Sequence, residues 1–492
     1  MLILSLDRES PVPAYKQILG GVVRLVDGGS LAPGDRLPPT RVLAQRIGVH
    51  RSTVLHAYEE LWALGYLESR PGSYSTVRRR PRTMATRAAS PETAIDWQSA
   101  ATPAARAAQE AALRLARLRP SPHNVVDFSR LAGDRNLAPA PELQRCLRSA
   151  LLAESKDLLD YGEPAGYRPL RETIARRMRI HGVSVSADEV AITGGAQQAL
   201  DLAIRTLTRP GDRIVTESPT YSGVLPLLRF HGLEPREIPM RQDGMDLDAL
   251  ERLLANERPA LLYTIPNFHN PTGITTSQAH RERLLALCEA HRLPILEDGF
   301  EEEMKYFGKA VLPIKSMDSR GLVLYVGTFS KVVFPGLRIG WIAAPRACTD
   351  VIIAVQRTCC LSGNSLAQAA VHRFCEQGLY EAHLRRLHKA YRRRMQAMLH
   401  GLAEHLPAER VSWTEPQGGY TLWLRVAGWR HGEAELYDRL LRDGVKVSPG
   451  SLFFSQPPPE PHFRLSIACL GEGEIVEGCR RLGRSLRAAL EG

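Results

Sequence analysis

Short apolar runs alternate with helical patterns from about residue 124 onward, and this alternation constrains the fold more than any other feature of the chain. Segments that are apolar throughout and are joined by helices indicate a largely parallel sheet covered by helices on both faces. The sequence therefore predicts an α/β domain. The expected strands are Val190–Thr193, Arg213–Thr216, Ala260–Ile265, Pro294–Glu297, Leu322–Val326 and Arg338–Ala343, and the expected helices between several of them are Ala196–Thr208, Leu247–Ala255 and Ser277–His291.

The pattern changes past about Tyr380. A long arginine-rich helix comes first, and two apolar segments, Tyr420–Leu424 and Phe463–Ile467, precede a terminal helix. This order predicts a smaller α+β subdomain at the C-terminal end of residues 124–492.

Residues 1–77 have a different organisation, in which three helices precede a short hairpin. Thr40 is expected to be the N-cap of the second helix, and a glycine-containing turn separates the second helix from the third. This arrangement predicts a helix-rich winged helix-turn-helix, which is a DNA-binding module. The expected helices are residues 12–29, Arg41–Ile47 and Arg51–Leu64, and the expected strands are Tyr66–Glu68 and Tyr74–Val77.

Length and composition point to a multidomain globular protein. The chain has 492 residues, of which 44% are hydrophobic and 24% are charged. No apolar run approaches the ~18 residues of a membrane span, and the N-terminus does not resemble a signal peptide. The eight cysteines are scattered, and the adjacent Cys359 and Cys360 suit neither a common disulfide nor a zinc site. We therefore expect reduced thiols, no metal site and a cytoplasmic location.

The positive charge of the chain is concentrated between the two modules. The formal net charge is +11, and residues 78–124 alone contribute +6 of it, from nine arginines and three acidic residues. Residues 78–123 therefore read as an arginine- and alanine-rich linker, in which Ala104–Arg119 is a candidate helix. A solvated linker and a segment attracted to DNA phosphates explain this charge equally well.

Chemically active residue types follow the ends of the expected strands. Ligands bind beyond the carboxyl ends of the strands in an open parallel sheet. Each residue taken singly reads more simply as a capping or solvated side chain, but their joint placement at strand ends favours a ligand site. The residues are Gly194-Gly195 at a helix start, Tyr221, Asn270 in a tight turn, Asp298, and Ser330-Lys331 followed by Arg338.

The order of these motifs resembles that of the fold-type-I enzymes that use pyridoxal 5'-phosphate, the aspartate aminotransferase superfamily. The resemblance covers roughly residues 124–492, and Asn270-Pro-Thr-Gly, Glu297-Asp298 and Ser330-Lys331 with Arg338 carry it. It implies that Lys331 is the Schiff-base lysine and that Arg464 binds a carboxylate or sulfonate of a ligand. The other implied cofactor contacts are Asp298 to the pyridine nitrogen, Asn270 to the ring oxygen, Tyr221 to the ring face, Ala196, Gln197, Thr328, Ser330 and Arg338 to the phosphate, and Tyr161 to the phosphate of the neighbouring subunit.

The N-terminal module is similar to the GntR family of winged helices. Gly34-Asp-Arg-Leu-Pro-Pro-Thr-Arg, Val49-His-Arg-Ser-Thr-Val and Gly65-Tyr-Leu-Glu-Ser-Arg-Pro-Gly carry the similarity. A GntR-like head fused to an aminotransferase-like body resembles the MocR subfamily of transcription regulators. The DNA contacts that this resemblance implies are Arg36, Arg41, Arg51, Ser52, Thr53 and the wing near Gly72.

Two positions depart from the pattern of these families. Phe300 stands where a tyrosine commonly reaches the ring oxygen of the cofactor, so this oxygen depends more on Asn270. Tyr74 stands where the wing usually has a further glycine, which predicts a tighter or less mobile wing.

The sequence thus leads to three hypotheses about function. The first is a regulator that binds double-stranded operator DNA as a head-to-tail homodimer and senses a small acidic amine or the cofactor itself. The second is an active aminotransferase that also binds DNA. The third is a repressor whose body only dimerises, which leaves Lys331, Asp298 and Arg338 without a purpose.

Overall fold

The computed structural model describes residues 4–68, 74–78, 95–118, 124–309 and 311–491. The chain divides into two compact units, Met1–Ala100 and Ala101–Gly492. The division falls inside the predicted linker, residues 78–123. Among the helices of these residues, none is both long and apolar enough to cross a lipid bilayer. All eight cysteines are free thiols, as expected.

The first unit contains a winged helix-turn-helix. The antiparallel strands β1 and β2 pair Leu67 with Val77, and α1 and α2 both pack on α3. The helices are α1 (Ala14–Asp27), α2 (Thr40–Ile47), α3 (Arg51–Ala63) and α4 (Trp97–Ala100), and the strands are β1 (Leu67–Glu68) and β2 (Thr76–Val77). Buried side chains from all three main helices form one core, which includes Ile18, Val22, Leu43, Val54, Tyr58 and Leu61.

The two ends of α2 follow from local chemistry. Gly48 ends α2 in the left-handed region, with φ of 69°, which glycine adopts at little cost. The expectation that Thr40 caps α2 is wrong, because Pro39 is the N-cap and Thr40 is the first helical residue. The Thr40 hydroxyl instead accepts a hydrogen bond of 3.5 Å from Nε of Arg51.

The second unit is built on an eight-stranded sheet with the order β4-β11-β10-β9-β8-β5-β6-β7. Strands β10, β9, β8, β5 and β6 pair in parallel, and β11 lies antiparallel between β10 and β4. The largely parallel sheet is therefore confirmed. The strands are β4 (Val190–Thr193), β5 (Arg213–Ser218), β6 (Glu234–Arg241), β7 (Gly244–Met245), β8 (Leu261–Thr264), β9 (Ile295–Asp298), β10 (Val323–Thr328) and β11 (Gly340–Ala343).

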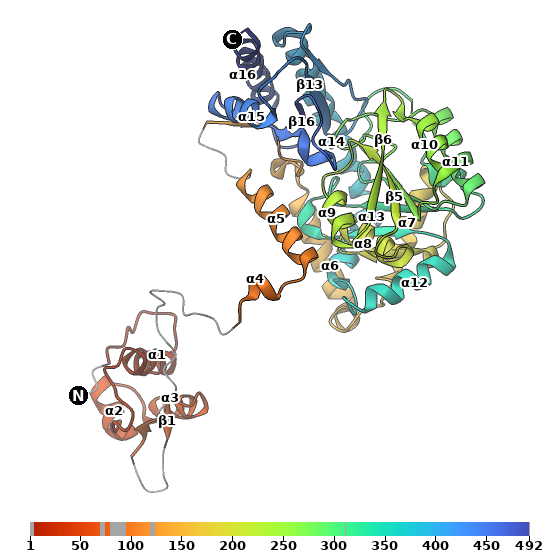
Figure 1. Ribbon diagram of the computed structural model, residues 1–492. Helices are drawn as coiled ribbons and strands as arrows, with labels where there is room; N and C mark the ends of the chain where they lie inside the picture. The colour runs from red at the N-terminus through yellow and green to blue at the C-terminus, as the bar shows by residue number, and fades with distance from the viewer. Residues whose placement is uncertain (1–3, 69–73, 79–94, 119–123, 310, 492) are drawn as a thin grey trace. The chain divides into compact units, whose positions relative to one another are not determined.

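Alternate residues of the sheet strands face two separate cores, as the two-residue period of a strand requires. Ile214 and Leu296 pack with α8 (Ala196–Leu207), α9 (Val224–Phe230) and α12 (Arg346–Arg357) on one face. Val215 and Ile295 pack with α10 (Leu247–Asn256) and α11 (Gln278–His291) on the other. Figure 1 shows α8 and α9 on one side of β5 and β6, and α10 and α11 on the other.

Further helices and a second sheet complete this unit. The four-stranded antiparallel sheet has the order β12-β13-β16-β15, and α14 packs on α16 beside it. This is the predicted C-terminal α+β subdomain. The remaining elements are α5 (Pro103–Arg117), β3 (Val126–Asp127), α6 (Ala140–Leu158), α7 (Arg168–Ile180), α13 (Ser365–Glu376), α14 (Leu379–His405), β12 (Val411–Trp413), β13 (Thr421–Val426), α15 (Glu433–Arg442), β14 (Val445–Lys446), β15 (Ser448–Pro449), β16 (His462–Ser466), α16 (Glu472–Glu491) and the 3-10 turns Arg135–Leu137, Ala187–Glu189, Ile314–Met317, Pro335–Leu337 and Gly450–Phe453.

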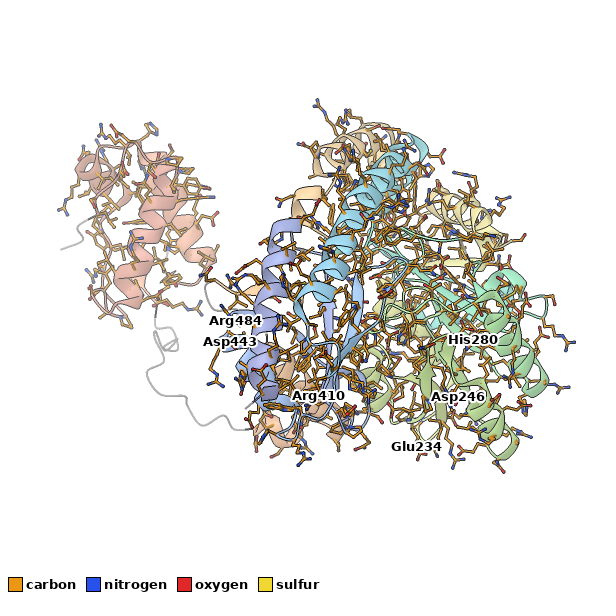
Figure 2. The ribbon with its side chains drawn as sticks, turned by 90° about the horizontal axis from the view of Figure 1, so that it is seen from above. Glu234, Asp246, His280, Arg410, Asp443 and Arg484 are labelled. Atoms are coloured by element: carbon orange, nitrogen blue, oxygen red, sulfur yellow. The ribbon has the colours of Figure 1, made fainter. Side chains whose placement is uncertain are left out.

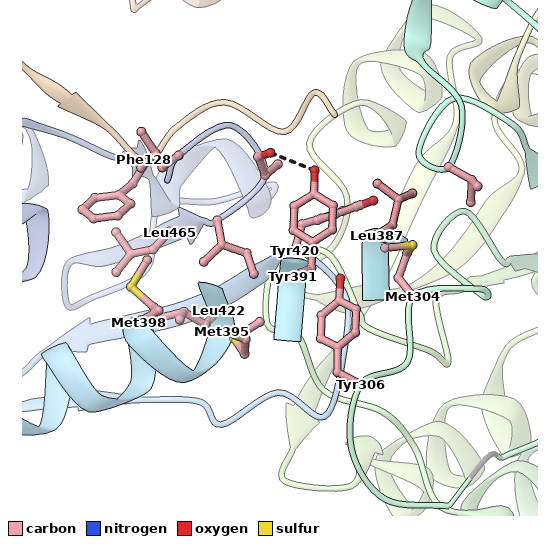
Figure 3. Close-up of a cluster of buried hydrophobic side chains, with 14 of the residues drawn as sticks. Phe128, Met304, Tyr306, Leu387, Tyr391, Met395, Met398, Tyr420, Leu422 and Leu465 are labelled. Atoms are coloured by element: carbon pink, nitrogen blue, oxygen red, sulfur yellow. Dashed lines mark hydrogen bonds between the residues drawn. The ribbon is translucent and has the colours of Figure 1, made fainter. Parts of the chain in front are cut away.

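One hydrophobic core joins this subdomain to the segment that precedes the sheet. Figure 3 shows Phe128 beside Leu465 and Met398, while Tyr391 and Tyr420 lie farther along the same cluster. Tyr391 donates a hydrogen bond of 3.0 Å to the carbonyl of Ala468, which satisfies its buried hydroxyl. Residues 126–128 are thus part of the C-terminal subdomain, with β3 paired to β14.

Hydrogen bonds to Asp246 and Asp443, both labelled in Figure 2, stabilise helix ends in the two parts of the second unit. Asp246 caps α10 by accepting hydrogen bonds of 3.1 Å from the amides of Asp248 and Ala249. In the C-terminal subdomain, Asp443 accepts a hydrogen bond of 2.5 Å from the hydroxyl of Ser485, which ties the end of α15 to α16.

Candidate functional site

The parallel strands of the large sheet end at one edge, and a cavity of about 280 Å³ lies there. We call it the strand-end cavity. It brings together every cofactor or effector contact that the family resemblance implied for the body, except Tyr161. The lining residues are Leu131, Ala196, Gln197, Tyr221, Ile265, Asn270, Asp298, Phe300, Thr328, Ser330, Lys331, Pro335, Arg338 and Arg464.

Lys331 presents a primary amine to the cavity just past the end of β10. Its Nζ donates a hydrogen bond of 2.7 Å to the carbonyl of Leu131 and lies 5.8 Å from the ring centre of Phe300. Removal from water lowers the pKa of Lys331, although the carboxyl group of Glu301 opposes this shift. A lysine with a lowered pKa is more often neutral, and a neutral amine is a nucleophile.

Asp298, the last residue of β9, is buried with one carboxylate oxygen unsatisfied. Its Oδ2 accepts a hydrogen bond of 2.9 Å from the hydroxyl of Tyr263, whereas Oδ1 has no partner within the described residues. Burial raises the pKa of Asp298 to about 6, while the bond from Tyr263 acts in the opposite direction. An unsatisfied buried carboxylate oxygen is costly, so the site suits a ligand that brings an N–H group to Asp298.

The part of the strand-end cavity at the start of α8 is suited to bind an anion. Helix α8 begins there without a side-chain cap, so its first amides are free to bind negative charge. Gly195 has φ of 102°, and a Cβ atom at this position would lie 2.8 Å from Nη2 of Arg338. Arg338 donates a hydrogen bond of 2.6 Å to the carbonyl of Gly194, and the hydroxyls of Thr328 and Ser330 are 3.0 Å apart.

Arg464 lies on β16 as a buried cation, and its hydrogen-bond acceptors among the described residues are all neutral. Its Nη1 donates to Oδ1 of Asn270 at 3.2 Å, and its Nη2 donates to the carbonyl of Ser129 at 2.8 Å and to the hydroxyl of Ser448 at 3.0 Å. Its Nε has no partner within the described residues. Burial lowers the pKa of Arg464 to about 10, although Glu301 opposes this shift. A guanidinium in this state is suited to a ligand carboxylate.

Tyr221 and Asn270 also line the strand-end cavity. The hydroxyl of Tyr221 donates a hydrogen bond of 3.2 Å to Oε1 of Gln197, and Nε2 of Gln197 donates to the carbonyl of Gly223 at 3.0 Å. The aromatic face of Tyr221 is therefore held by the start of α8. Asn270 is buried and is oriented by Arg464.

Two residues of this site were missed by sequence reasoning. Tyr263 lies within β8, where an aromatic residue is expected for packing alone, so its bond to Asp298 left no signal. Glu301 belongs to three consecutive glutamates, a pattern typical of a solvated surface, but it is buried. Its Oε2 accepts a hydrogen bond of 3.1 Å from the amide of Tyr420, and burial raises its pKa to about 8.

Tyr161 does not reach the strand-end cavity. Its side chain is 80% exposed in the single chain. The expectation that it serves a neighbouring subunit stays a prediction.

The predicted DNA-contacting residues of the head are mostly exposed. Arg36, Arg41, Arg51 and Ser52 are exposed and Thr53 is partly buried, while Gly72 lies outside the described residues. Arg51, Ser52 and Thr53 form the first turn of α3, where His50 caps the helix by accepting from the amide of Ser52 at 3.3 Å. Within the described part of the head, no carboxylate lies within 4.0 Å of these arginines. Tyr74 lies under Arg36, with 5.5 Å from the guanidinium carbon to the ring centre.

Comparison with protein families gives two matches on one chain. The family described as aminotransferase class I and II matches residues 131–482. The family described as bacterial regulatory proteins, gntR family, matches residues 14–77. The two matches cover the two units separately.

Relatives with both parts match nearly the full chain. The probable rhizopine catabolism regulatory protein MocR of Rhizobium meliloti is 31% identical over 493 residues, which cover 99% of this chain and 97% of that protein. The uncharacterized HTH-type transcriptional regulator YisV of Bacillus subtilis is 30% identical over 481 residues, which cover 97% and 98% respectively.

Solved structures of aminotransferases match the second unit. LysN, an α-aminoadipate aminotransferase of Thermus thermophilus complexed with N-(5'-phosphopyridoxyl)-L-leucine, has a TM-score of 0.74 and 32% identity over 81% of this chain and 100% of its own. A multiple substrate aminotransferase of Thermococcus profundus has a TM-score of 0.76 and 31% identity over the same shares.

The groups around the strand-end cavity fit the cofactor of this family. An amine at Lys331, an unsatisfied carboxylate oxygen at Asp298 and an anion site at the start of α8 match the aldehyde, ring nitrogen and phosphate of pyridoxal phosphate. The chain therefore belongs to the aminotransferase class I and II family and, through its gntR-family head, to the MocR-type transcription regulators, with pyridoxal 5'-phosphate as its cofactor.

Proposed function

We propose that a small amine carrying an acidic group binds in the strand-end cavity and thereby changes the affinity of the head for operator DNA. One observation carries this proposal: the amine of Lys331, the unsatisfied oxygen of Asp298 and the carboxylate-free Arg464 line one cavity in a chain that also has a DNA-binding head. Such coupling requires that the amine bind two arrangements of the protein with different free energies.

Residues that line the strand-end cavity can be assigned to each part of the cofactor. When bound, pyridoxal phosphate supplies an aldehyde that joins covalently to primary amines. We assign the covalent link to Nζ of Lys331 and the ring-nitrogen contact to Asp298. The phosphate contacts are assigned to the start of α8 at Ala196 and Gln197, and to Thr328, Ser330 and Arg338. Tyr221 would stack on the ring, and Asn270 would donate a hydrogen bond to the ring oxygen.

The surroundings of Arg464 are the reason to propose that the effector carries an acidic group. It is buried in the same cavity as Lys331, and within the described part of the chain it bonds only to neutral oxygen atoms. A carboxylate or sulfonate would replace these neutral acceptors with a charged one, and hydrogen bonds to charged groups are the stronger kind. An amine without an acidic group should therefore bind more weakly.

The head is proposed to read DNA through the first turn of α3. Arg51, Ser52 and Thr53 are presented there, where a recognition helix contacts base edges in the major groove. Arg36 and Arg41, which have no carboxylate partner within the described residues, would contact phosphates. Gly72 would lie at the wing contact.

The regulator is proposed to work in the cytoplasm as a head-to-tail homodimer, in which two heads bind two half-sites. Tyr161 supports a dimer because it is largely exposed in the single chain and does not line the strand-end cavity of its own subunit. A second subunit would cover this ring if Tyr161 contacts the phosphate of the partner's cofactor.

A second candidate function is transamination. Two aminotransferases of known structure match the second unit over their full length, and the lysine, aspartate and two arginines that this chemistry uses line one cavity. Turnover of an amine and a 2-oxoacid at about 1 to 1000 per second would favour the enzyme. Turnover far below this range, together with amine-dependent DNA binding, would favour the regulator.

The test compares wild type with Lys331→Ala. The wild-type holoprotein should absorb visible light, hold a cofactor that borohydride fixes to the protein, and bind operator DNA with an affinity that amines change. Lys331→Ala should lose the fixed cofactor and the amine response while still binding DNA. A borohydride-fixed adduct in Lys331→Ala, or a wild-type protein that stays colourless with added pyridoxal phosphate, would overturn the proposal.

A further inference from the structure

A second cavity, of about 390 Å³, adjoins the strand-end cavity and shares Arg464 with it. We call it the side cavity. Its walls come from the segment before α6, from β14 and β15 with the turn after them, and from the last turns of α5. The lining residues are Leu115, Leu118, Asp127, Ser129, Arg130, Ser222, Lys446, Val447, Ser448, Pro449, Leu452, Phe453 and Arg464.

The charged lining residues of the side cavity are unbalanced. Among the described residues they are Arg130, Lys446, Arg464 and one acid, Asp127. Lys446 and Asp127 form an ion pair of 3.6 Å with each other. Within the described residues, no carboxylate lies within 4.0 Å of Arg130 or Arg464. Two guanidinium groups therefore face this cavity without an acidic partner, and a cavity with such an excess favours anions.

Arg464 connects the two cavities through its two terminal nitrogens. Nη1 bonds to Asn270 on the cofactor side, while Nη2 bonds to Ser129 and Ser448, which both line the side cavity. A ligand whose acid group is bound by Arg464 can therefore extend into the side cavity. Leu115, Leu452 and Phe453 offer apolar wall for the methylene groups of such a ligand.

We propose that the side cavity binds the distal part of the effector and that the effector is an amino acid with a second anionic group on its side chain. Arg464 binds one acid group and Arg130 binds the other. This inference rests on the proposed function, because it places the amine of the effector beside Lys331. A site built to bind a polar group rejects the analogue that lacks it, so neutral side chains of the same length should bind poorly.

The test uses two matched pairs of amino acids, L-glutamate with L-norvaline and L-2-aminoadipate with L-norleucine. Within each pair the chain lengths are alike and only the distal carboxylate differs. Binding is followed on the holoprotein by the change in visible absorbance. Wild type should bind at least one diacid about tenfold more tightly than its neutral counterpart. Arg130→Gln should lose this preference and keep its affinity for the neutral amino acid.

Arg135→Gln is the control, because Arg135 is also exposed, lies in the same segment, and does not line the side cavity. It removes the same charge and should keep the preference. The proposal is overturned if wild type shows no preference in either pair, or if Arg130→Gln retains the preference. A holoprotein whose cofactor is not joined to Lys331 would instead contradict the proposed function.

Discussion

At the residue scale, the buried guanidinium of Arg464 is expected to determine which ligands bind. Its donors reach Asn270, Ser129 and Ser448, none of which is charged. Arg464→Ala should therefore weaken the response to an amino acid effector by about 10- to 100-fold, which is the loss of a charged hydrogen-bonded contact. Cofactor content should not change, because the assigned phosphate contacts lie at α8 and Arg338. Absorbance titration measures both quantities, and an unaltered dose–response would mean that the acid binds elsewhere.

Glu301 gives a pH dependence to the stability of the cofactor-free protein. Burial raises its pKa from 4.5 to about 8, so the folded state binds this proton more tightly than the unfolded chain does. Its contribution to the free energy of unfolding is therefore full below pH 4.5 and is lost as the pH rises through about 8. Glu301→Gln should gain stability relative to wild type across this interval, by at most about 1.4 kcal/mol per pH unit.

Urea unfolding at a series of pH values measures this difference, and Glu303→Gln is the matched control. Burial of Glu303 is outweighed by His181 and Arg177, which lower the pKa of Glu303 to about 2. Between about pH 5 and 6 the difference between this control and wild type should stay flat, since Glu303 is ionised there in both states and His181, whose pKa Glu303 raises, still carries its proton. A flat difference for Glu301→Gln as well would contradict the assignment of a buried, protonated Glu301.

At the element scale, the first turn of α3 is the part of the head that carries the sequence-reading prediction. Arg51→Ala should weaken operator binding by about 1–3 kcal/mol, with little change for unrelated DNA, because a base contact is lost. Arg24→Ala removes the same charge from the last turn of α1 and serves as the control. Equal losses for the two variants at fixed salt would show that Arg51 contributes charge alone. Fluorescence anisotropy with operator and scrambled duplexes makes this measurement.

The strands also show which parts of the fold and of the site the sequence could predict. Strand β4 matches its prediction residue for residue, because its apolar run ends at two glycines. Strand β6 was missed, since Pro235, Pro239 and several charged residues resemble a loop, and it pairs in the sheet near one edge. The strand-end residues gathered in one cavity because parallel strands share an edge. The burial of Glu301 depends on packing between segments over a hundred residues apart, as its hydrogen bond from the amide of Tyr420 shows.

Helix α5 illustrates the same limit. The sequence indicated a helix there, and the structure has one, capped by the Thr102 hydroxyl, which accepts from the amide of Ala105 at 3.2 Å. Its packing on α9 had no signal in the sequence. This contact is significant because α9 begins three residues after Tyr221, and Leu115 of α5 lines the side cavity. The helix thus touches the proposed effector site from the linker side.

At the scale of the whole molecule, the proposed head-to-tail dimer can be tested by combining two defects. If Tyr161 contacts the cofactor of the partner, a mixed dimer of Lys331→Ala and Tyr161→Ala subunits contains one site with an intact Lys331 and an intact Tyr161. About half of its sites should bind pyridoxal phosphate with wild-type affinity. Dimers of Tyr161→Ala alone should bind it about tenfold more weakly, as expected for a lost hydrogen bond to a charged group. If Tyr161 served its own subunit, the mixed dimer would contain no intact site, and absorbance titration would show only the weaker affinity.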